Sequence, residues 1–306
     1  MLIDEIVDFC DKKYTTLGDK CGCTICNHPL NKCSGSCYNC LYQIHYPDPE
    51  RIKKGTQKTT YDCPKMLFHY VCQYSFLYAT ELIYAFEHEI EYLKDYPHFN
   101  ILSLGCGGCA DLMGFEKFKL KNNFIQPISY LGLDINNNWI QINNKIAKYC
   151  EHNQIKYKIR YDDVFKCFRQ TGLNYANIVI VSYLISYLYN TNQIKTIDSF
   201  LDDFTKNVVA KKGRKEKLLL VVNDINTYKR GRNYFEHFAR KIRDYNLSII
   251  KMEYKYFDTG NLFDGQKIGS PYSFRGCEFN VPSSILEKYH TDVNCKQTIQ
   301  LLLEVV

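Results

Sequence analysis

Glycines and carboxylates stand at the ends of three apolar segments of this chain, where together they could hold a nucleoside. The run Gly105-Cys106-Gly107-Gly108-Cys109 follows the first segment, and glycines there allow a tight strand-to-helix turn and the close approach of a ligand to the backbone. Asp134 ends the next segment, where a carboxylate can accept both hydroxyl hydrogens of a ribose. Asp162-Asp163-Val164 end the third, where a carboxylate can accept from an adenine amino group. The simpler interpretations are a glycine-rich turn without a ligand, and turns or helix caps at the aspartates.

The elements that must position these residues alternate between strand-like and helix-like segments. Short apolar runs typical of strands occupy residues 100–104, 128–133, 155–161, 178–182 and 217–222. Such alternation predicts a parallel sheet with crossover helices, in which the strand ends share one edge. Two last strand candidates, 247–257 and 298–306, are joined by a stretch rich in Gly, Pro, Asn and Ser, which predicts an antiparallel final strand.

Cysteines concentrate near the N-terminus, where nine of the 15 lie within the first 72 residues. Cys23-x-x-Cys26 and Cys37-x-x-Cys40 form two knuckles whose four thiolates can close a tetrahedron around zinc. Further candidate ligands, enough for a second zinc ion, are Cys21, Cys33, Cys63, His28 and His45. The alternatives are buried thiols without a metal, and an iron–sulfur cluster on the Cys33-x3-Cys37-x2-Cys40 spacing.

The chain is expected to divide into two parts. Residues 1–64 would form an N-terminal unit, with a helix over 1–18 and then the zinc-stapled module. Residues 65–306 would form the α/β domain, and the 3.6-residue period over 62–95 predicts a long amphipathic helix at its start.

The motifs of the second part resemble those of the class I, Rossmann-like methyltransferases that use S-adenosylmethionine. ILSLGCGGCAD (101–111) is similar to their first motif, the acidic residue of YLGLDINNNW (130–139) to their second, and YDDVF (161–165) to their third. NIVIVSYLISYL (177–188) stands where these enzymes carry the fourth strand and its substrate-facing loop. The resemblance covers roughly residues 65–306.

The resemblance implies a seven-stranded, mostly parallel Rossmann-like sheet with an antiparallel last strand. It also implies that Gly105 and Gly107 lie against the methionine part of the cofactor, that Asp134 holds the ribose, and that Asp162 or Asp163 contacts adenine. The full cofactor-binding set expected on this basis is Leu104, Gly105, Cys106, Gly107, Asp134, Ile135, Asp162, Asp163, Val164 and Ser182.

Two residues depart from the family pattern, and a second cofactor class has similar signals. Cys109 stands where the last glycine usually is, and Ser103 stands where an acidic residue is common. A dinucleotide-dependent oxidoreductase also uses a glycine turn and an acidic strand end. The aspartate pair after the third strand and the antiparallel end of the sheet favour the methyl donor.

Polar residues after the fourth and fifth predicted strands are the candidates for catalysis. Methyl transfer needs a nucleophile held in line with the sulfonium, and in many cases a base. Ser182 and Tyr183 follow the fourth strand, and Asp224 follows the fifth. The chain lacks an Asn-Pro-Pro-Tyr motif, which argues against exocyclic adenine amines, and a nitrogen or oxygen acceptor remains.

Charge and aromatic residues make RNA the leading substrate class. The net charge is +6, and nine basic residues stand against two acidic ones between positions 206 and 232. A second basic stretch interleaves with tyrosines, as single-stranded nucleic acid binding requires: Tyr42, Tyr46, Arg51, Lys53, Lys54, Lys58 and Tyr61. The alternatives are methylation of a protein, and a non-catalytic partner subunit or sensor that keeps the fold.

Length and composition limit the remaining classes. A chain of 306 residues with 45% hydrophobic and 24% charged residues falls outside the disordered, fibrous and collagen-like classes. No run of about 18 apolar residues is present and the N-terminus is acidic, which predicts a soluble cytoplasmic protein that makes no use of a membrane.

Overall fold

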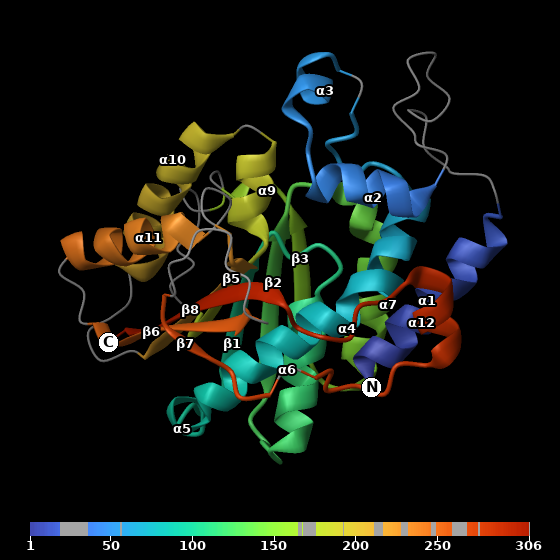
Figure 1. Cartoon of the computed structure of the whole chain (residues 1–306). Helices are drawn as coiled ribbons and strands as arrows, with labels where there is room; N and C mark the ends of the chain where they lie inside the picture. The colour runs from blue at the N-terminus through green and yellow to red at the C-terminus, as the bar shows by residue number, and fades with distance from the viewer. Residues whose placement is uncertain are drawn as a thin grey trace.

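The computed structural model describes most of the chain, namely residues 1–18, 36–55, 57–164, 167, 176–191, 193–210, 217–227, 232–245, 249–258, 268–274 and 276–305. Helices and strands alternate along it (Figure 1). The helical elements are α1 (Leu2–Thr16), α2 (Cys37–His45), α3 (Pro49–Lys53), α4 (Pro64–His88), α5 (Ile90–Leu93), α6 (Ala110–Lys121), η2 (Asn137–Trp139), α7 (Ile140–His152), α9 (Leu184–Asn190), α10 (Ile194–Phe204), η3 (Thr205–Val209), α11 (Arg232–Asp244) and α12 (Ser283–Tyr289).

The strands form one sheet in the order β3-β2-β1-β4-β5-β8-β6-β7. They are β1 (Phe99–Leu104), β2 (Ile128–Asp134), β3 (Lys156–Tyr161), β4 (Ile178–Ser182), β5 (Leu218–Ile225), β6 (Ile249–Asp258), β7 (Ser270–Pro271) and β8 (Gln297–Val305). The first five follow the 3-2-1-4-5 order of a doubly wound Rossmann sheet, and β8 runs antiparallel between β5 and β6. The predicted α/β class and the antiparallel last strand are confirmed.

The strand count differs from the prediction of seven. The eighth strand, β7, has two residues and pairs with β6 through Lys255–Ser270 and Tyr256–Pro271. It escaped prediction because two residues carry no alternating pattern, and their pairing depends only on where the preceding segment returns to the sheet edge.

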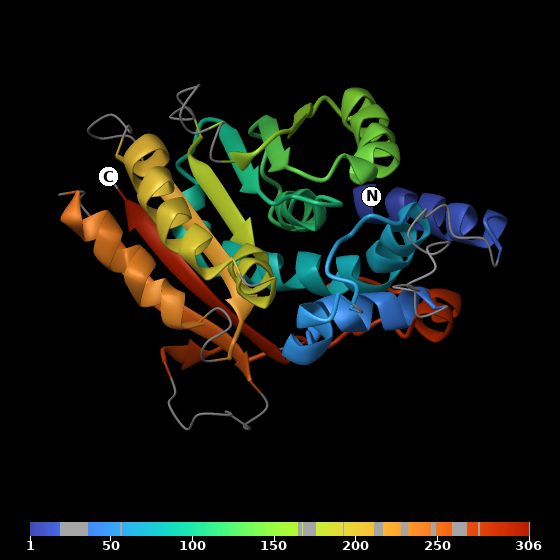
Figure 2. The same cartoon turned by 90° about the horizontal axis from the view of Figure 1, so that it is seen from above.

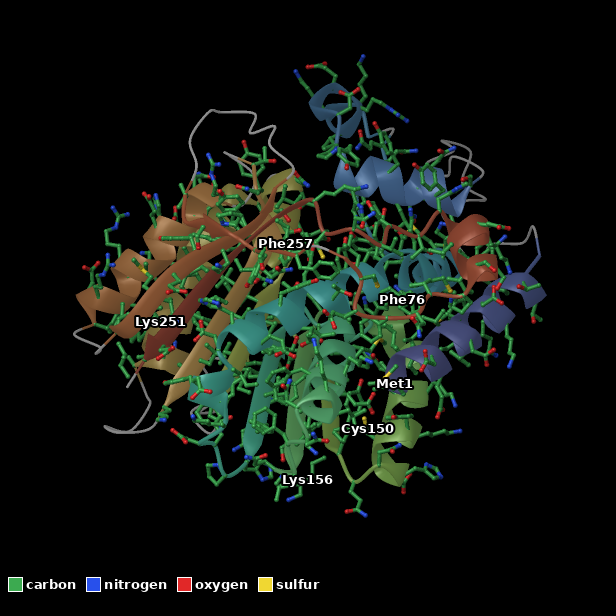
Figure 3. All side chains as sticks on the ribbon, turned by 60° about the horizontal axis from the view of Figure 1, so that its bottom comes forward. Met1, Phe76, Cys150, Lys156, Lys251 and Phe257 are labelled. Atoms are coloured by element: carbon green, nitrogen blue, oxygen red, sulfur yellow. The ribbon has the colours of Figure 1, made fainter. Side chains whose placement is uncertain are left out.

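Both faces of the sheet are covered, which explains why its central strands are continuous apolar runs rather than alternating ones. In β5, Leu219 and Val221 join the core under α1, α4, α6 and α7, whereas Leu218, Leu220 and Val222 join the core under α9, α10 and α11. Figure 2 shows α10 and α11 on one side of the sheet and α4 and α7 on the other, and side chains fill both layers (Figure 3).

The long helix α4 is the central helix of its layer. It begins with Pro64 at its first turn, where a missing N–H costs nothing, and it ends one residue before the short helix α5. The predicted helix over 62–95 is therefore two helices. Gly114 of α6 lets the two helices approach so closely that a Cβ there would lie 2.5 Å from the carbonyl oxygen of Ala79. Within the described part of the chain, no helix combines the length and the apolarity needed to cross a membrane, α4 included.

The N-terminal helix α1 packs into the same core as the sheet. Its buried residues Leu2, Ile3, Ile6 and Val7 belong to the cluster that holds Ile101 of β1. The α2 helix also packs on α4, through Leu41 and Ile44 against Met66. The division at residue 64 stays a prediction, and helices on its N-terminal side pack closely against α4 on the other side.

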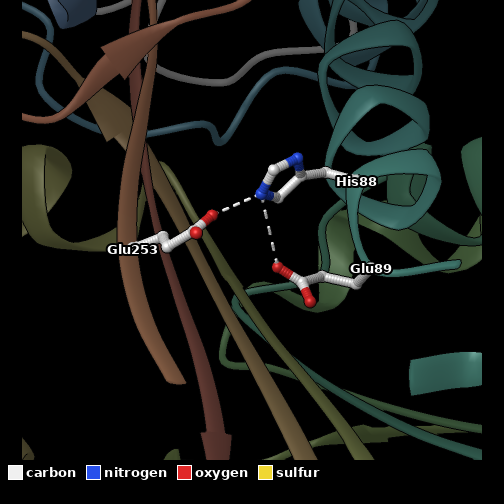
Figure 4. A group of neighbouring side chains, drawn as sticks. All are labelled: His88, Glu89 and Glu253. Atoms are coloured by element: carbon white, nitrogen blue, oxygen red, sulfur yellow. Dashed lines mark hydrogen bonds and ion pairs between the residues drawn. The ribbon is translucent and has the colours of Figure 1, made fainter. Parts of the chain in front are cut away.

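Ion pairs anchor the C-terminal end of α4 to strand β6. His88 points toward Glu253 of β6 and hydrogen-bonds its carboxylate through Nε2, and a carboxylate oxygen of Glu89 lies 3.9 Å from the same nitrogen (Figure 4). The Lys251 Nζ lies 3.1 Å from Glu89, 3.6 Å from Glu253 and 3.8 Å from Glu304. This network fixes how α4 sits over the sheet.

Candidate functional site

The C-terminal ends of β1, β2, β4 and β5 open on one cavity of about 1310 Å³. This volume exceeds the ~300–1,000 Å³ typical of a single small-ligand pocket. Besides the strand ends, the cavity is lined by one face of α4, by residues of α9 and α10, by residues 44–46 and 60–62, and by four residues between 292 and 298. It lies at the C-terminal ends of the neighbouring strands β1 and β4, where the strand order reverses, which is the switch point at which open α/β sheets bind ligands.

The glycine turn after β1 has the backbone that only glycine adopts at low cost. Gly105 and Gly107 both line the cavity, with φ angles of +69° and +49°. The amide of Gly105 donates to the carbonyl of Leu133 at 2.8 Å, which ties the turn to β2. A Cβ on Gly107 would lie 3.3 Å from the ring of Trp139, so a side chain there would also crowd the cavity wall.

Asp134 connects this turn to the loop after β2. Its Oδ2 accepts from the Gly107 amide and its Oδ1 from the Asn136 amide, each at 2.8 Å. Burial raises the pKa of this carboxyl, and the two backbone donors oppose that shift. An ionised carboxylate has about four acceptor positions, so each oxygen keeps a lone pair for a further donor.

The residues after β3 divide between the cavity and the surface. Asp163 and Val164 line the cavity. Asp162 pairs instead with Arg160 at 3.3 Å, and its amide donates to the Asp134 carbonyl at 3.1 Å. Of the other cofactor contacts expected from the resemblance, Ile135 and Ser182 line the cavity, whereas Leu104 and Cys106 are buried beneath it.

The two departures from the family pattern have local explanations. Cys109 has a φ of +57°, the left-handed conformation that a glycine would adopt more easily, and its Sγ lies 3.4 Å from the Tyr157 hydroxyl. Ser103 is buried and hydrogen-bonds Asp111, which also accepts from Tyr130 at 3.0 Å. An acidic side chain therefore lies beside position 103, supplied by α6.

Of the three predicted catalytic residues, two line the cavity. Ser182 ends β4 and Tyr183 follows it with a φ of +54°, at the start of α9. Asp224 does not line the cavity: it is fully buried and accepts from the Ser186 amide at 3.0 Å and from the Ile225 amide at 2.7 Å. Its position is that of a carboxylate that caps α9.

A buried glutamate on α4 lines the cavity and was not anticipated from the sequence. Glu81 is 1% exposed, and its carboxylate accepts from the hydroxyls of Tyr183 at 2.8 Å and Thr298 at 2.5 Å and from the Asn223 amide at 3.0 Å. Burial raises its pKa to about 7, against the lowering effect of these donors. Gln300 supports the group by donating to the backbone carbonyl of Glu81 at 2.7 Å.

Tyrosines of α4 continue this lining toward the outside. Tyr70, Tyr74, Tyr78 and Glu81 recur at spacings of four, four and three residues, which places them on one face of the helix. Tyr74 and Tyr78 stack with ring centroids 5.4 Å apart, and Tyr78 lies 4.3 Å from Tyr183. The sequence signal was present, but an aromatic stripe on an amphipathic helix is equally typical of a core.

The predicted metal ligands fall in several places. Cys21, Cys23, Cys26, His28 and Cys33 lie outside the described residues. Cys37 and Cys40 stand one turn apart on α2, and Cys40 packs with Cys63, the residue before α4, in one apolar cluster. His45 lines the cavity, and its Nε2 lies 3.0 Å from the Tyr61 hydroxyl.

Metal-ligand spacing occurs elsewhere in the described part, at the anchor of α4. Among the described residues, His88, Glu89 and Glu253 are the one group of three whose ligand atoms lie within 4.8 Å of one another. Lys251 already contacts both carboxylates of that group. The ammonium group offsets part of their negative charge and repels a further cation, so we interpret this group as an ion-pair network.

Comparisons with known proteins return solved structures of methyltransferases. No protein-family model and no curated protein sequence matches the chain. The similar structures include a protein described as a class I S-adenosylmethionine-dependent methyltransferase from Listeria monocytogenes, at 11% identity and a TM-score of 0.46, covering 100% of this chain and 88% of that one. The plantazolicin methyltransferase BpumL, solved with SAH, is 12% identical with a TM-score of 0.41, covering 97% and 99%.

A third similar structure is an S-adenosylmethionine-dependent methyltransferase from Archaeoglobus fulgidus, at 15% identity and a TM-score of 0.40, covering 74% of this chain and 94% of that one. At these identities and TM-scores the similarities carry no argument about activity. The functional conclusion has to rest on the geometry of the cavity.

The capping position of Asp224 predicts a structural effect of its substitution. Asp224→Asn removes one of two acceptor oxygens and should lower the free energy of unfolding by about 1–3 kcal/mol, measured by urea denaturation. Asp202→Asn, at an exposed ion pair with Lys241, is the matched control and should change it by less than about 0.5 kcal/mol. A fully stable Asp224→Asn protein would return Asp224 to the list of catalytic candidates.

Proposed function

We propose that this protein is a methyltransferase that uses S-adenosylmethionine and transfers its methyl group to a nitrogen or oxygen. The arrangement at Asp134 supports this most directly. A carboxylate that ends β2 accepts from the glycine turn after β1 at 2.8 Å and keeps acceptor positions toward the cavity at the switch point of the sheet. The ribose hydroxyls of a nucleoside require acceptor groups placed in this way.

The residues on the cavity wall fit the parts of this cofactor. Gly105 and Gly107 leave room for its methionine part, Asp134 would accept from the ribose hydroxyls, and Asp163 with Val164 would contact adenine. When bound, the cofactor supplies an electrophilic methyl group on a sulfonium. Ser182 and Tyr183 also line the cavity, and the Tyr183 ring lies 4.3 Å from that of Tyr78, so both residues can orient an acceptor.

An oxidoreductase with a dinucleotide cofactor is less well supported. The antiparallel β8 lies between β5 and β6, and Asp163 places a carboxylate from the end of β3 on the same wall as Asp134. The rest of the cavity is lined by tyrosines and carboxylates, which suit the pyrophosphate of a dinucleotide poorly because of charge repulsion.

The role of Asp134 can be tested by substitution. Asp134→Ala removes two charge-assisted hydrogen bonds to the ribose and should weaken S-adenosylhomocysteine binding by about 100-fold in calorimetric titration. Asp162→Ala is the matched control, because Asp162 pairs with Arg160 away from the cavity, and should stay within about threefold. If wild-type protein binds neither S-adenosylmethionine nor S-adenosylhomocysteine, a structural subunit replaces the enzyme as the better proposal.

RNA is the macromolecular substrate class that we propose for the outer surface, on the strength of one aromatic pair beside basic residues. Tyr42 and Tyr46 are exposed and lie 4.8 Å apart, and Tyr46 also lines the cavity. The short helix α3 follows directly and carries Arg51 and Lys53, with Lys54 at its end. Proteins bind single-stranded RNA by stacking its bases on aromatic rings and pairing its phosphates with nearby cations. Six of the nine basic residues between 206 and 232 lie outside the described residues.

Salt dependence tests this surface. The triple variant Arg51→Gln, Lys53→Gln, Lys54→Gln should reduce the slope of log affinity against log salt by about 2 for a labelled single-stranded RNA, because each lost phosphate contact contributes roughly 0.7. Anisotropy titrations at several salt concentrations measure it. The control replaces Lys12, Lys13 and Lys148, exposed lysines of α1 and α7, and should keep the slope. Equal slopes in wild type and triple variant would remove RNA as the substrate of this surface.

Zinc binding by the N-terminal cysteines is proposed from their spacing. Two of the proposed ligands, Cys37 and Cys40, stand one helical turn apart, as a chelating pair requires, and Cys40 packs with Cys63. Within the described residues these three sulfurs do not all lie within 4.8 Å of one another. A complete site therefore needs the cysteines between 21 and 33.

Metal analysis of the purified protein tests this directly. Wild type should contain about one or two zinc ions per chain, and Cys37→Ala with Cys40→Ala should lose about one. Cys150→Ala with Cys295→Ala, two buried cysteines outside the module, is the control and should keep the metal. A brown protein that contains iron would favour the cluster instead, and a metal-free wild type would contradict both.

A further inference from the structure

The cavity wall is acidic in a protein that is basic overall. Five carboxylates and one lysine line it within the described part of the chain, although the net charge of the chain is +6. These residues are Asp62, Glu81, Asp134, Asp163, Asp292 and Lys296. His45 also lines the wall, where its Nε2 lies 3.0 Å from the Tyr61 hydroxyl. The cavity is therefore built for a ligand with positive charge.

Two of these carboxylates already have lysine partners. Lys58 pairs with Asp62, and Lys296 pairs with Asp292 at 3.4 Å. Asp134 is the proposed acceptor for the ribose hydroxyls of the cofactor. Glu81 differs from these three carboxylates, because it accepts hydrogen bonds from the neutral side chains of Tyr183, Thr298 and Asn223. Three donors leave one of about four acceptor positions open.

The approach to Glu81 is walled by aromatic rings. Tyr61, Tyr70, Tyr74, Tyr78, Tyr183 and Tyr187 all line the cavity. Neighbouring rings lie close: Tyr61 is 5.9 Å from Tyr187 and 5.6 Å from Tyr70, and Tyr78 is 4.3 Å from Tyr183. The faces of such rings attract ammonium groups, most strongly where water is excluded.

We propose that the methyl acceptor is an aliphatic amine, which enters as its ammonium ion between these tyrosines and meets Glu81 as counter-ion and proton acceptor. This inference rests on the proposed methyl transfer. A buried carboxylate that lacks a cation is costly to maintain, and a cationic substrate would supply the missing charge. A sugar-phosphate backbone would be repelled by the same wall. The amine therefore replaces RNA as the methyl acceptor, and the outer surface at Tyr42 and Tyr46 is left as an RNA-binding surface.

The proposed reaction balances in protons and electrons. The ammonium gives one proton to the Glu81 carboxylate, directly or through the Tyr183 hydroxyl that donates to it at 2.8 Å. The freed nitrogen lone pair forms the new N–C bond as the C–S bond of the sulfonium breaks, and the sulfur keeps that electron pair. Products are S-adenosylhomocysteine, a methylated ammonium and a proton that Glu81 later releases to water.

A pair of probes separates the effect of charge on binding from the effect of shape. Choline and its neutral isostere 3,3-dimethyl-1-butanol have the same branched end and differ in the cationic nitrogen. With full-length protein saturated with S-adenosylhomocysteine, wild type should bind choline at least about 10-fold more tightly than the neutral probe, by ligand-observed NMR titration. Glu81→Gln should reduce this preference to within about twofold.

Matched variants keep the test independent of folding. Glu116 is also a buried glutamate that accepts from a tyrosine hydroxyl, that of Tyr149, yet it does not line the cavity, so Glu116→Gln should keep the preference. Tyr78→Phe retains the aromatic ring and should keep choline binding, whereas Tyr78→Leu should weaken it by about 3- to 10-fold.

The pH dependence gives a second readout. Choline binding should strengthen as the pH rises through about 7, because burial raises the pKa of Glu81 to about that value and the described groups that face it are the neutral Tyr183, Thr298 and Asn223 and the acidic Asp292. Lys296, the one lysine among the described residues of the wall, pairs with Asp292 at 3.4 Å. The strengthening should vanish in Glu81→Gln. Equal or undetectable binding of both probes by a wild type that binds S-adenosylhomocysteine overturns the amine assignment alone. If the wild type does not bind S-adenosylhomocysteine, the proposed function itself is overturned.

Discussion

The carboxylate of Asp134 joins the two loops on which the cofactor side of the cavity depends. Through its two oxygens it holds the amide of Gly107, after β1, and the amide of Asn136, after β2. Parallel pairing brings Leu104 and Leu133 level at the ends of these strands, so the carboxylate reaches both loops without strain. The left-handed glycines, the position of Trp139 and the open acceptor positions all follow from this connection.

The helix α4 serves two purposes on opposite faces. One face packs into the core, where Phe76, Ala79 and Ile83 are buried, and Gly114 of α6 allows a close approach. The other face carries the tyrosines and Glu81. A helix that must present a buried carboxylate needs a fixed rotation. Two sets of contacts fix the rotation of α4 about its axis. Glu89 pairs with Lys251 at the end of the helix, and three donors bind Glu81 nearer to its middle.

The strands β5 and β8 complete the environment of Glu81. Asn223 of β5 pairs in register with Gln300 of β8, and their side chains hydrogen-bond each other at 2.9 Å. Thr298 lies two residues before Gln300 and therefore on the same face of the sheet, toward α4. The antiparallel strand thus contributes to the acceptor side of the cavity as well as joining β5 to β6 in the sheet.

Much of the fold and of the cofactor side could be predicted from the sequence, because both depend on neighbours along the chain. Buried parallel strands are apolar runs, and the runs at 128–133 and 178–182 match β2 and β4 within a residue. The glycine turn and Asp134 follow their strands directly, so strand position alone sets where they stand. Their proximity to each other in space is a consequence of parallel pairing.

The acceptor side was decided by tertiary structure. No local sequence feature distinguishes a tyrosine stripe that lines a cavity from one that lies in a core. The environment of Glu81 depends on hydrogen bonds from Tyr183, Asn223 and Thr298, which lie 102, 142 and 217 residues away. Asp224 shows the reverse case. The sequence analysis places it after the fifth strand, whereas β5 extends to Ile225 and includes it, and the Ser186 amide of α9 donates to its carboxylate at 3.0 Å. Sequence determines which residues end each strand, and packing determines which way their side chains point, because that direction depends on contacts between distant segments.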